Sequence, residues 1–146
     1  MSVTTELRAE LERLVAAVAP WLLELPGVGS ISAAQVLVSW SHAGRLRSDS
    51  AFAALAGANP IPASSGQVIR HRLNRSGDRQ LNRALHTIVV ARLRNDWQTR
   101  AYATRRTAEG KSVREIRRCL KRAVARQLFK LLERYDRSAV EVVKLA

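Results

Sequence analysis

Apolar residues recur at helical spacing near both ends of the chain, and this pattern restricts the possible fold more than any other feature. The N-terminal stripe has spacings of 4, 3, 4 and 4 residues, which places its members on one face of a helix. It consists of Leu7, Leu11, Leu14, Val18 and Leu22. Near the other end, SVRE at 112–115 has the pattern of a capping box, in which the serine and the glutamate satisfy amides at a helix start. It opens a long predicted helix to about residue 135, with these residues inward: Ile116, Leu120, Ala123, Leu128 and Leu131.

Shorter helices are predicted between these two. They are Ser30–Trp40, the sequence SAFAALAG ending at Gly57, a helix capped by Asp78 with Leu81, Leu85 and Ile88 on one face, and a segment between Thr99 and Gly110. Residues 58–77 contain two prolines and two glycines, which is typical of a loop, although QVIRHRL within them could form a short strand. The predicted fold class is all-α with one irregular central loop.

The N-terminal stripe predicts a helix that precedes the main domain. Thr4 or Thr5 would cap it, Pro20 would kink it, and Pro26 would end it. We therefore predict a linker helix over residues 1–21, a helical domain over 22–135, and a tail over 136–146. Leu7, Leu11 and Leu14 have no close sequence partner to cover them, which predicts a homo-oligomer.

Positive charge is concentrated in one block of the chain. The net charge is +13, but residues 1–69 hold four basic and five acidic side chains, whereas residues 70–130 hold eighteen basic and four acidic ones. Concentrated charge of one sign repels itself, and a polyanion relieves this repulsion. Nucleic acid is the expected partner, and the alternative is a generally basic surface without a specific role.

The composition excludes several other classes of protein. Cys119 is the one cysteine, so no internal disulfide and no cysteine-based zinc site can form. The start of the chain lacks the features of a signal peptide, and no apolar run reaches the roughly 18 residues of a membrane span. We expect a soluble bacterial protein in the cytoplasm, associated with the nucleoid, with no membrane partner and no metal site or cofactor in this chain.

The sequence LPGVG, followed by a helix of small residues, indicates a helix–hairpin–helix-like element. Gly27 and Gly29 allow a tight turn, and the amides of that turn with the start of the next helix form an anion site. Ser30 and Ser32 add hydroxyl donors for a DNA phosphate. The alternative is a plain helix–turn–helix connection in which the glycines serve geometry alone.

Several short elements follow this hairpin in a fixed order. They are Arg47-Ser48, Phe52-Ala53, Ala56-Gly57-Ala58-Asn59-Pro60, Ser65-Gly66, and Gly77-Asp78 with Leu81. This order resembles the C-terminal transposase domain of the "IS-one-ten" insertion-sequence family, the bridge-RNA-guided recombinases, and that of the related Piv-type DNA invertases. The resemblance covers about residues 22–132. The stripe in residues 4–22 is similar to the coiled-coil segment that joins the two domains in that family and helps to pair protomers, so the resemblance implies a coiled-coil-like N-terminal helix.

The resemblance implies a catalytic serine in the serine–glycine loop. In that family the serine attacks a DNA phosphodiester and becomes covalently linked to the DNA. Carried over, this role falls on Ser65 or on its neighbour Ser64, and Ser65 is preferred because it directly precedes Gly66. Loop serines that only make turn hydrogen bonds are the alternative. His71 would be the general base or a phosphate ligand.

The remaining expectations concern DNA contacts and the rest of the enzyme. The predicted DNA-binding residues are Gly27, Gly29, Ser30, Arg70, Arg72, Arg75, Arg79, Arg117, Arg118, Lys121 and Arg122. In the family, a separate RuvC-like domain supplies a DEDD set of carboxylates that hold magnesium, and no such cluster is evident here. We therefore expect a truncated transposase that binds DNA, and in the family context a structured guide RNA, and that is inactive alone. The competing hypothesis is a helix–hairpin–helix DNA-binding module with no catalytic role.

Overall fold

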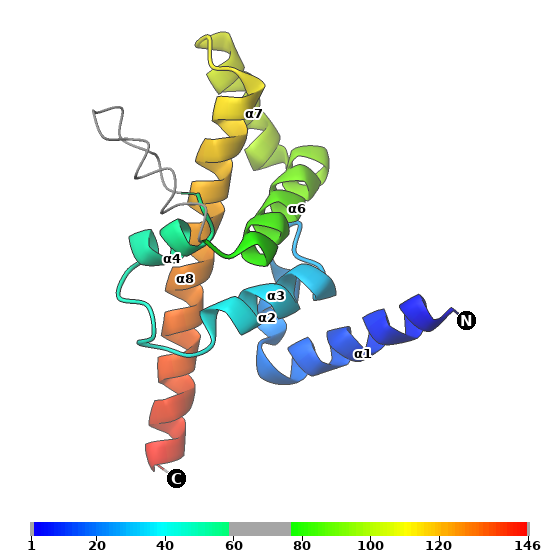
Figure 1. Ribbon diagram of the computed structural model, residues 1–146, viewed down its shortest axis with the longest axis vertical. Helices are drawn as coiled ribbons and strands as arrows, with labels where there is room; N and C mark the ends of the chain where they lie inside the picture. The colour runs from blue at the N-terminus through cyan, green and yellow to red at the C-terminus, as the bar shows by residue number, and fades with distance from the viewer. Residues whose placement is uncertain (1, 59–76, 146) are drawn as a thin grey trace.

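A computed structural model describes residues 2–58 and 77–145, and all regular secondary structure in these ranges is helical, which confirms the all-α class (Figure 1). The helices are α1 (Val3–Val18), α2 (Pro20–Glu24), α3 (Ser30–Trp40), α4 (Asp49–Leu55), α6 (Arg79–Asn95), α7 (Trp97–Ala108) and α8 (Val113–Leu145). Within the same ranges, no helix combines the length and apolar character that crossing a bilayer requires. The strand suggested within 67–73 lies outside the described residues.

Helix α8 is the longest element, and α4, α6 and α7 pack against it (Figure 1). At its start the Ser112 hydroxyl accepts a hydrogen bond from the Glu115 amide at 3.2 Å, as the serine of the predicted capping box should. Its buried residues are Ile116, Val124, Ala125, Leu128, Phe129 and Leu132. The prediction that Ala123 points inward was wrong, because a face repeating every four residues from Ile116 passes through Val124 instead, and Ala123 is exposed.

The core lies where α2, α3, α4, α6 and α8 meet. Leu22, Phe52, Leu85 and Leu128 belong to one buried cluster, and each has essentially no exposed surface. The Phe52 ring lies 5.9 Å from that of Phe129, which joins α4 to α8. The order of the helices along the chain thus brings together segments that are far apart in sequence.

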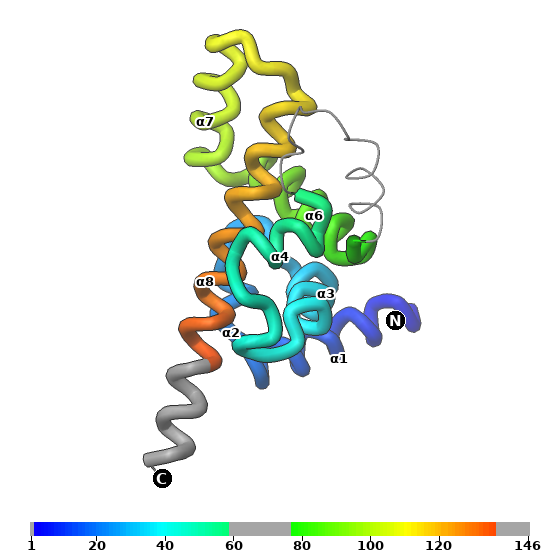
Figure 2. Tube along the Cα trace, turned by 60° about the vertical axis from the view of Figure 1, so that its left-hand side comes forward, coloured from blue at the N-terminus to red at the C-terminus, as the bar shows by residue number. Residues whose placement is uncertain are grey.

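The predicted continuous N-terminal helix is in fact two helices. Helix α1 ends at Val18, and Ala19 leaves the helical region with φ −148° and ψ 68° before Pro20 opens α2. A proline disfavours helical angles in the residue before it, so the break falls one residue ahead of the expected kink. The cap is Ser2 rather than Thr4 or Thr5, and its hydroxyl accepts from the Thr5 amide. Figure 2 shows that the N-terminal part of α1 projects beyond the other helices.

Aspartates cap both α6 and α7. The Asp78 carboxylate accepts from the Leu81 amide at 2.9 Å, as the sequence predicts. Helix α7 begins at Trp97, two residues before the predicted boundary at Thr99, because Asp96 is its cap. Thr99 is instead buried, and both its amide and its hydroxyl donate to the Asp96 carboxylate.

Candidate nucleic-acid interface

The hairpin between α2 and α3 rests directly on α6. Gly27 has φ +74°, and a Cβ placed there would lie 2.8 Å from the Ile88 carbonyl oxygen. The Arg92 Nε donates to the Pro26 carbonyl oxygen at 2.7 Å, and the same guanidinium donates to Gln127 of α8 at 2.9 Å. The glycine at position 27 therefore has a packing role, whatever else the turn does.

The start of α3 differs from the turn that precedes it. Gly29 is exposed, and a Cβ there would meet no atom within 4 Å. Helix α3 has no side-chain cap, so Gly29 and the half-buried Ser30 lie at an uncapped helix N-terminus. Ser32 is 6% exposed, so the prediction that its hydroxyl is available to a phosphate was wrong: the residue faces the core.

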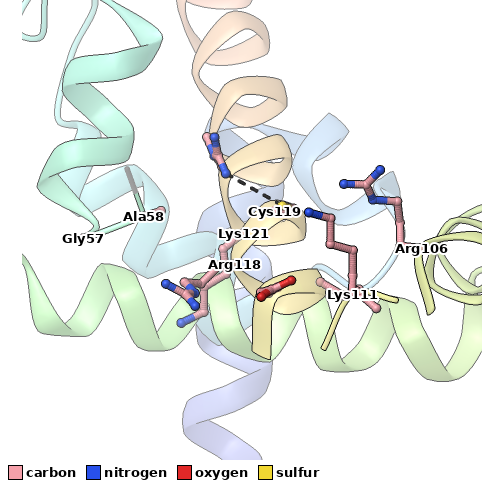
Figure 3. Close-up of a pocket in the computed structure, with 10 residues that line it drawn as sticks. Gly57, Ala58, Arg106, Lys111, Arg118, Cys119 and Lys121 are labelled. Carbon is pink, nitrogen blue, oxygen red and sulfur yellow. Dashed lines mark hydrogen bonds between the residues drawn. The ribbon is translucent and has the colours of Figure 1, made fainter. Parts of the chain in front are cut away.

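A second feature, which we call the basic cavity, lies where the end of α4, the α7–α8 turn and the first turns of α8 meet. Its volume is about 330 Å³, and its wall includes five cationic side chains and one carboxylate, that of Glu115. The cations are Arg106, Lys111, Arg118, Lys121 and Arg122. Gly57, Ala58, Ile116 and Cys119 complete the wall (Figure 3).

Most of these cations lack a carboxylate partner among the described residues. Arg106 donates to Glu109 at 2.7 Å, whereas Lys121 donates to the neutral side-chain oxygen of Asn82 at 2.8 Å. The Arg122 guanidinium is 3.8 Å from the Cys119 sulfur, a weak acceptor, and its Nε has no partner within the described residues. Donors of this kind are free to bind an anion.

Two titratable groups near the cavity have lowered pKa values. Burial lowers the pKa of Lys121. On the neighbouring helix α6, burial and the charges of Lys121 and Arg117 lower the pKa of His86. Taking charge out of water and placing like charges together both disfavour the protonated form. The negative charge of a bound phosphate would favour both protonated forms and so oppose these shifts.

The structure brings together only some of the predicted DNA-binding residues. Arg118, Lys121 and Arg122 line the basic cavity, and Arg117 is exposed beside His86. Arg79 is exposed at the start of α6 and is not part of the cavity wall. The hairpin residues Gly27, Gly29 and Ser30 belong to a different part of the surface.

The remaining predicted residues lie outside the described ranges. They are Ser64, Ser65, Arg70, Arg72 and Arg75, and His71 lies there too. The described residues on either side of this segment are held by α4: the Ala58 amide donates to the Ala53 carbonyl at 2.8 Å, and the Asp78 amide to the Leu55 carbonyl at 2.6 Å. Ala58 itself lines the basic cavity.

Sequence reasoning missed the cavity residues Arg106, Lys111 and Cys119. The excess of basic residues over 70–130 includes the first two, but nothing in the local pattern shows that the α7–α8 turn folds back toward the end of α4. Asp78 and Asp96 cap α6 and α7, so their carboxylates already have local hydrogen-bond partners. In the described part of the chain, no group of three or more histidine, cysteine, aspartate or glutamate side chains is placed to hold a metal ion.

A helical domain with an excess of basic residues and a cavity lined by five cations is typical of proteins that bind nucleic acids. The sequence comparisons specify the family. Residues 19–104 match the family described as "Transposase IS116/IS110/IS902 family", more than half of the chain. The chain belongs to this family.

A curated relative supports the same assignment. The insertion element IS110 uncharacterized 43.6 kDa protein of Streptomyces coelicolor (strain ATCC BAA-471 / A3(2) / M145) is 34% identical over 109 residues. The aligned part is 73% of this chain and 27% of the relative, so the chain spans about a quarter of the length of the protein it matches. No solved structure matches the chain.

Proposed function

We propose that this chain is a DNA-binding transposase domain of an insertion-sequence element. The observation that carries the proposal is the basic cavity, where five cations face a single carboxylate. Membership in a transposase family makes DNA the polyanion of first choice, and structured guide RNA a second one. The hairpin residues Gly29 and Ser30 would add contacts to backbone phosphates, which position a duplex without reading its sequence.

The proposal predicts a strong dependence of DNA binding on salt. Replacing Arg117, Arg118 and Arg122 with alanine should weaken binding to every duplex. The slope of log affinity against log salt is negative, and its magnitude should fall by up to about three units, because binding then releases fewer counterions from the DNA. Fluorescence anisotropy over a series of salt concentrations measures both quantities.

The matched control removes the same charge elsewhere. Arg8, Arg13 and Arg47 are exposed and lie outside the basic block, so their triple alanine variant changes net charge equally. It should bind DNA almost as the parent does. Equal losses in the two triple variants would show that net charge, rather than the α8 face, drives binding.

We also propose that the chain carries the nucleophile of a recombinase site, with Ser65 in that role. Attack by the Ser65 oxygen forms an oxygen–phosphorus bond, breaks the bond between phosphorus and the leaving deoxyribose oxygen, and transfers the serine proton to a base. His71 is the candidate base in this segment, because arginine remains protonated. Arginines near the loop would stabilise the charge that develops on the phosphoryl oxygens.

The arrangement of the described residues supports this part of the proposal. Ser65 follows Ala58 by seven residues, and a chain of that length reaches about 25 Å at most. Ala58 lines the basic cavity, so the cations of α7 and α8 are within reach of a phosphate attacked by Ser65. The magnesium that the family resemblance implies belongs, in this proposal, to carboxylates of a separate domain.

The nucleophile is tested by trapping a covalent protein–DNA adduct with and without a supplied DEDD domain. In an enzyme that includes this domain, Ser65→Ala should abolish the adduct and leave DNA affinity within a few-fold, because it removes a nucleophile but little contact area. Ser64→Ala should be milder. The reverse ranking assigns the role to Ser64, and an unchanged adduct yield in the double variant leaves a non-catalytic DNA-binding module.

A further inference from the structure

We propose that the basic cavity holds one unpaired nucleotide of the bound strand, with its phosphate against the cations and its sugar and base against the less polar part of the wall. The inference rests on the proposed function, because it specifies which part of the nucleic acid enters the site.

The size of the cavity exceeds what a phosphate contact needs. A phosphate of a duplex can be bound on an open surface, whereas a volume of about 330 Å³ falls at the lower end of the range for pockets that enclose small organic ligands. A single nucleotide is a ligand of that class. Stacked base pairs cannot enter such a cavity, so the nucleotide must be unpaired or turned out of the helix.

The cavity has a cationic side and an apolar side, which suit the phosphate and the base of a nucleotide respectively. On the cationic side, Arg118 and Lys111 have no ion-pair partner among the described residues, and the Arg122 guanidinium lacks a strong acceptor. Ile116, Ala58 and Cys119 provide the apolar side. Figure 3 shows Ala58 at the end of α4, across the cavity from Lys111 and Arg106.

Both surfaces are of the kind that holds unpaired nucleotides in other proteins. Bases without a pairing partner lie against aromatic, apolar or guanidinium surfaces, while cations track the backbone. Arg106 contributes a guanidinium group to the cavity wall; it pairs with Glu109 at 2.7 Å, and its guanidinium carbon lies 5.9 Å from the centre of the Tyr102 ring. Glu115 is the one acidic lining residue and has no ion pair among the described residues, so its carboxylate can accept a hydrogen bond from a base amino group.

The chain contains a natural reporter of the cavity. Cys119 is its one cysteine and lies in the cavity wall, so the rate at which a thiol reagent labels it measures how accessible the cavity is. The experiment uses the full chain with three DNA duplexes of equal length: one fully paired, one with a single bulged nucleotide, and one with a bulged abasic residue. Inorganic phosphate and a deoxynucleoside monophosphate are tested alone.

The bulged duplex should bind about tenfold more tightly than the paired one and should slow the labelling of Cys119 by a similar factor. The abasic bulge should lose most of both effects, and the monophosphate should protect Cys119 better than inorganic phosphate does. Lys121→Gln should remove the preference for the bulge, whereas Arg94→Gln, which changes an exposed residue of α6 outside the wall, should retain it.

The outcomes separate this inference from the proposed function. If the paired and bulged duplexes bind equally with the same salt dependence and leave Cys119 equally reactive, DNA binding holds and the nucleotide site is wrong. Equal protection by phosphate and by the monophosphate would also overturn it, since the cavity would then be a phosphate site alone. Absence of salt-dependent binding to any duplex overturns the proposed function, while the monophosphate arm still tests the cavity itself. Thermal unfolding of the Lys121→Gln and Arg94→Gln variants shows whether each is folded.

Discussion

Single glycines in the hairpin serve different purposes. Gly27 adopts a left-handed conformation with φ +74° and lies against the backbone of α6, whereas Gly29 has φ −94° and open space around it. The sequence predicts a tight turn at LPGVG, but it does not show which glycine contacts another helix, because Ile88 is 61 residues away from Gly27 in the chain. The packing role of Gly27 could therefore be recognised only in the folded structure.

Gly27→Ala should lower the free energy of unfolding by about 2 kcal/mol or more, because the added Cβ meets a backbone oxygen at 2.8 Å and alanine disfavours positive φ. Gly29→Ser is the matched control and should change stability little, since serine is a good residue at a helix N-cap. Chemical denaturation followed by circular dichroism measures both. Equal stability of the Gly27→Ala variant and the parent would contradict the contact with α6.

At the scale of helices, capping and turn residues in the sequence correctly predicted helix boundaries that depend on neighbouring residues. The start of α6 and the bounds of α3 follow from an aspartate cap and from glycine and proline positions, and the structure has both where expected. The boundary between α1 and α2 and the inward face of α8 were predicted less well. Pro20 shifts the boundary between α1 and α2 to the residue before it. The inward face of α8 depends on which helices pack against it, and the spacing of apolar residues alone does not reveal this.

Asp78 connects three elements and makes stability depend on pH. Its carboxylate accepts from Ser39 of α3 at 2.6 Å and caps α6, while its amide donates to α4. Burial by itself raises the pKa of Asp78, but the hydrogen bonds from Ser39 and from the Leu81 and Gln80 amides, with the charge of Arg45, outweigh it and lower the pKa. A lowered pKa in the folded state means that the ionised carboxylate stabilises the fold.

This stabilisation should be fully present above pH ~4, the unfolded value for aspartate, and should be lost as the pH falls through the lower pKa of the folded state. The parent should therefore have a larger unfolding free energy than the Asp78→Asn variant. This difference should be greatest above pH ~4 and should shrink in more acidic solution. Ser39→Ala should show the same trend with a smaller amplitude. Denaturant titrations at several pH values measure it, and a difference independent of pH would rule out this role of the carboxylate.

At the scale of the whole molecule, the charge could be predicted and the cavity could not. The excess of basic residues over 70–130 indicated a polyanion, and Arg118, Lys121 and Arg122 were expected to bind it. Their common cavity also requires the end of α4 and the α7–α8 turn, which are more than forty residues apart in sequence and meet only through packing against α8. The predicted domain boundaries stay predictions, although Val15 and Ala19 from the predicted linker region belong to the same core as the main domain.

One apolar surface on the described part of the chain faces away from this core. Helix α1 buries Val15, yet Leu7 is 61% exposed, Leu14 51% and Val18 73%. These residues and the partly buried Leu11 are spaced 4, 3 and 4 apart, which is the repeat that places residues in the seam of a coiled coil. A repeat of this kind is self-complementary, so we propose a second copy of the chain as the group that covers it.

Leu7→Asp combined with Leu14→Asp should therefore convert a dimer into a monomer, because two carboxylates would face their counterparts across the seam. The unfolding transition of the isolated chain should barely change, since both side chains are already exposed to water. Val15→Asp is the informative contrast: that residue is 3% exposed in the core, so its charge should unfold the protein rather than dissociate it. Analytical ultracentrifugation over a range of concentrations, combined with thermal melts, separates the two effects. A parent chain that sediments as a monomer at all concentrations would refute the dimer.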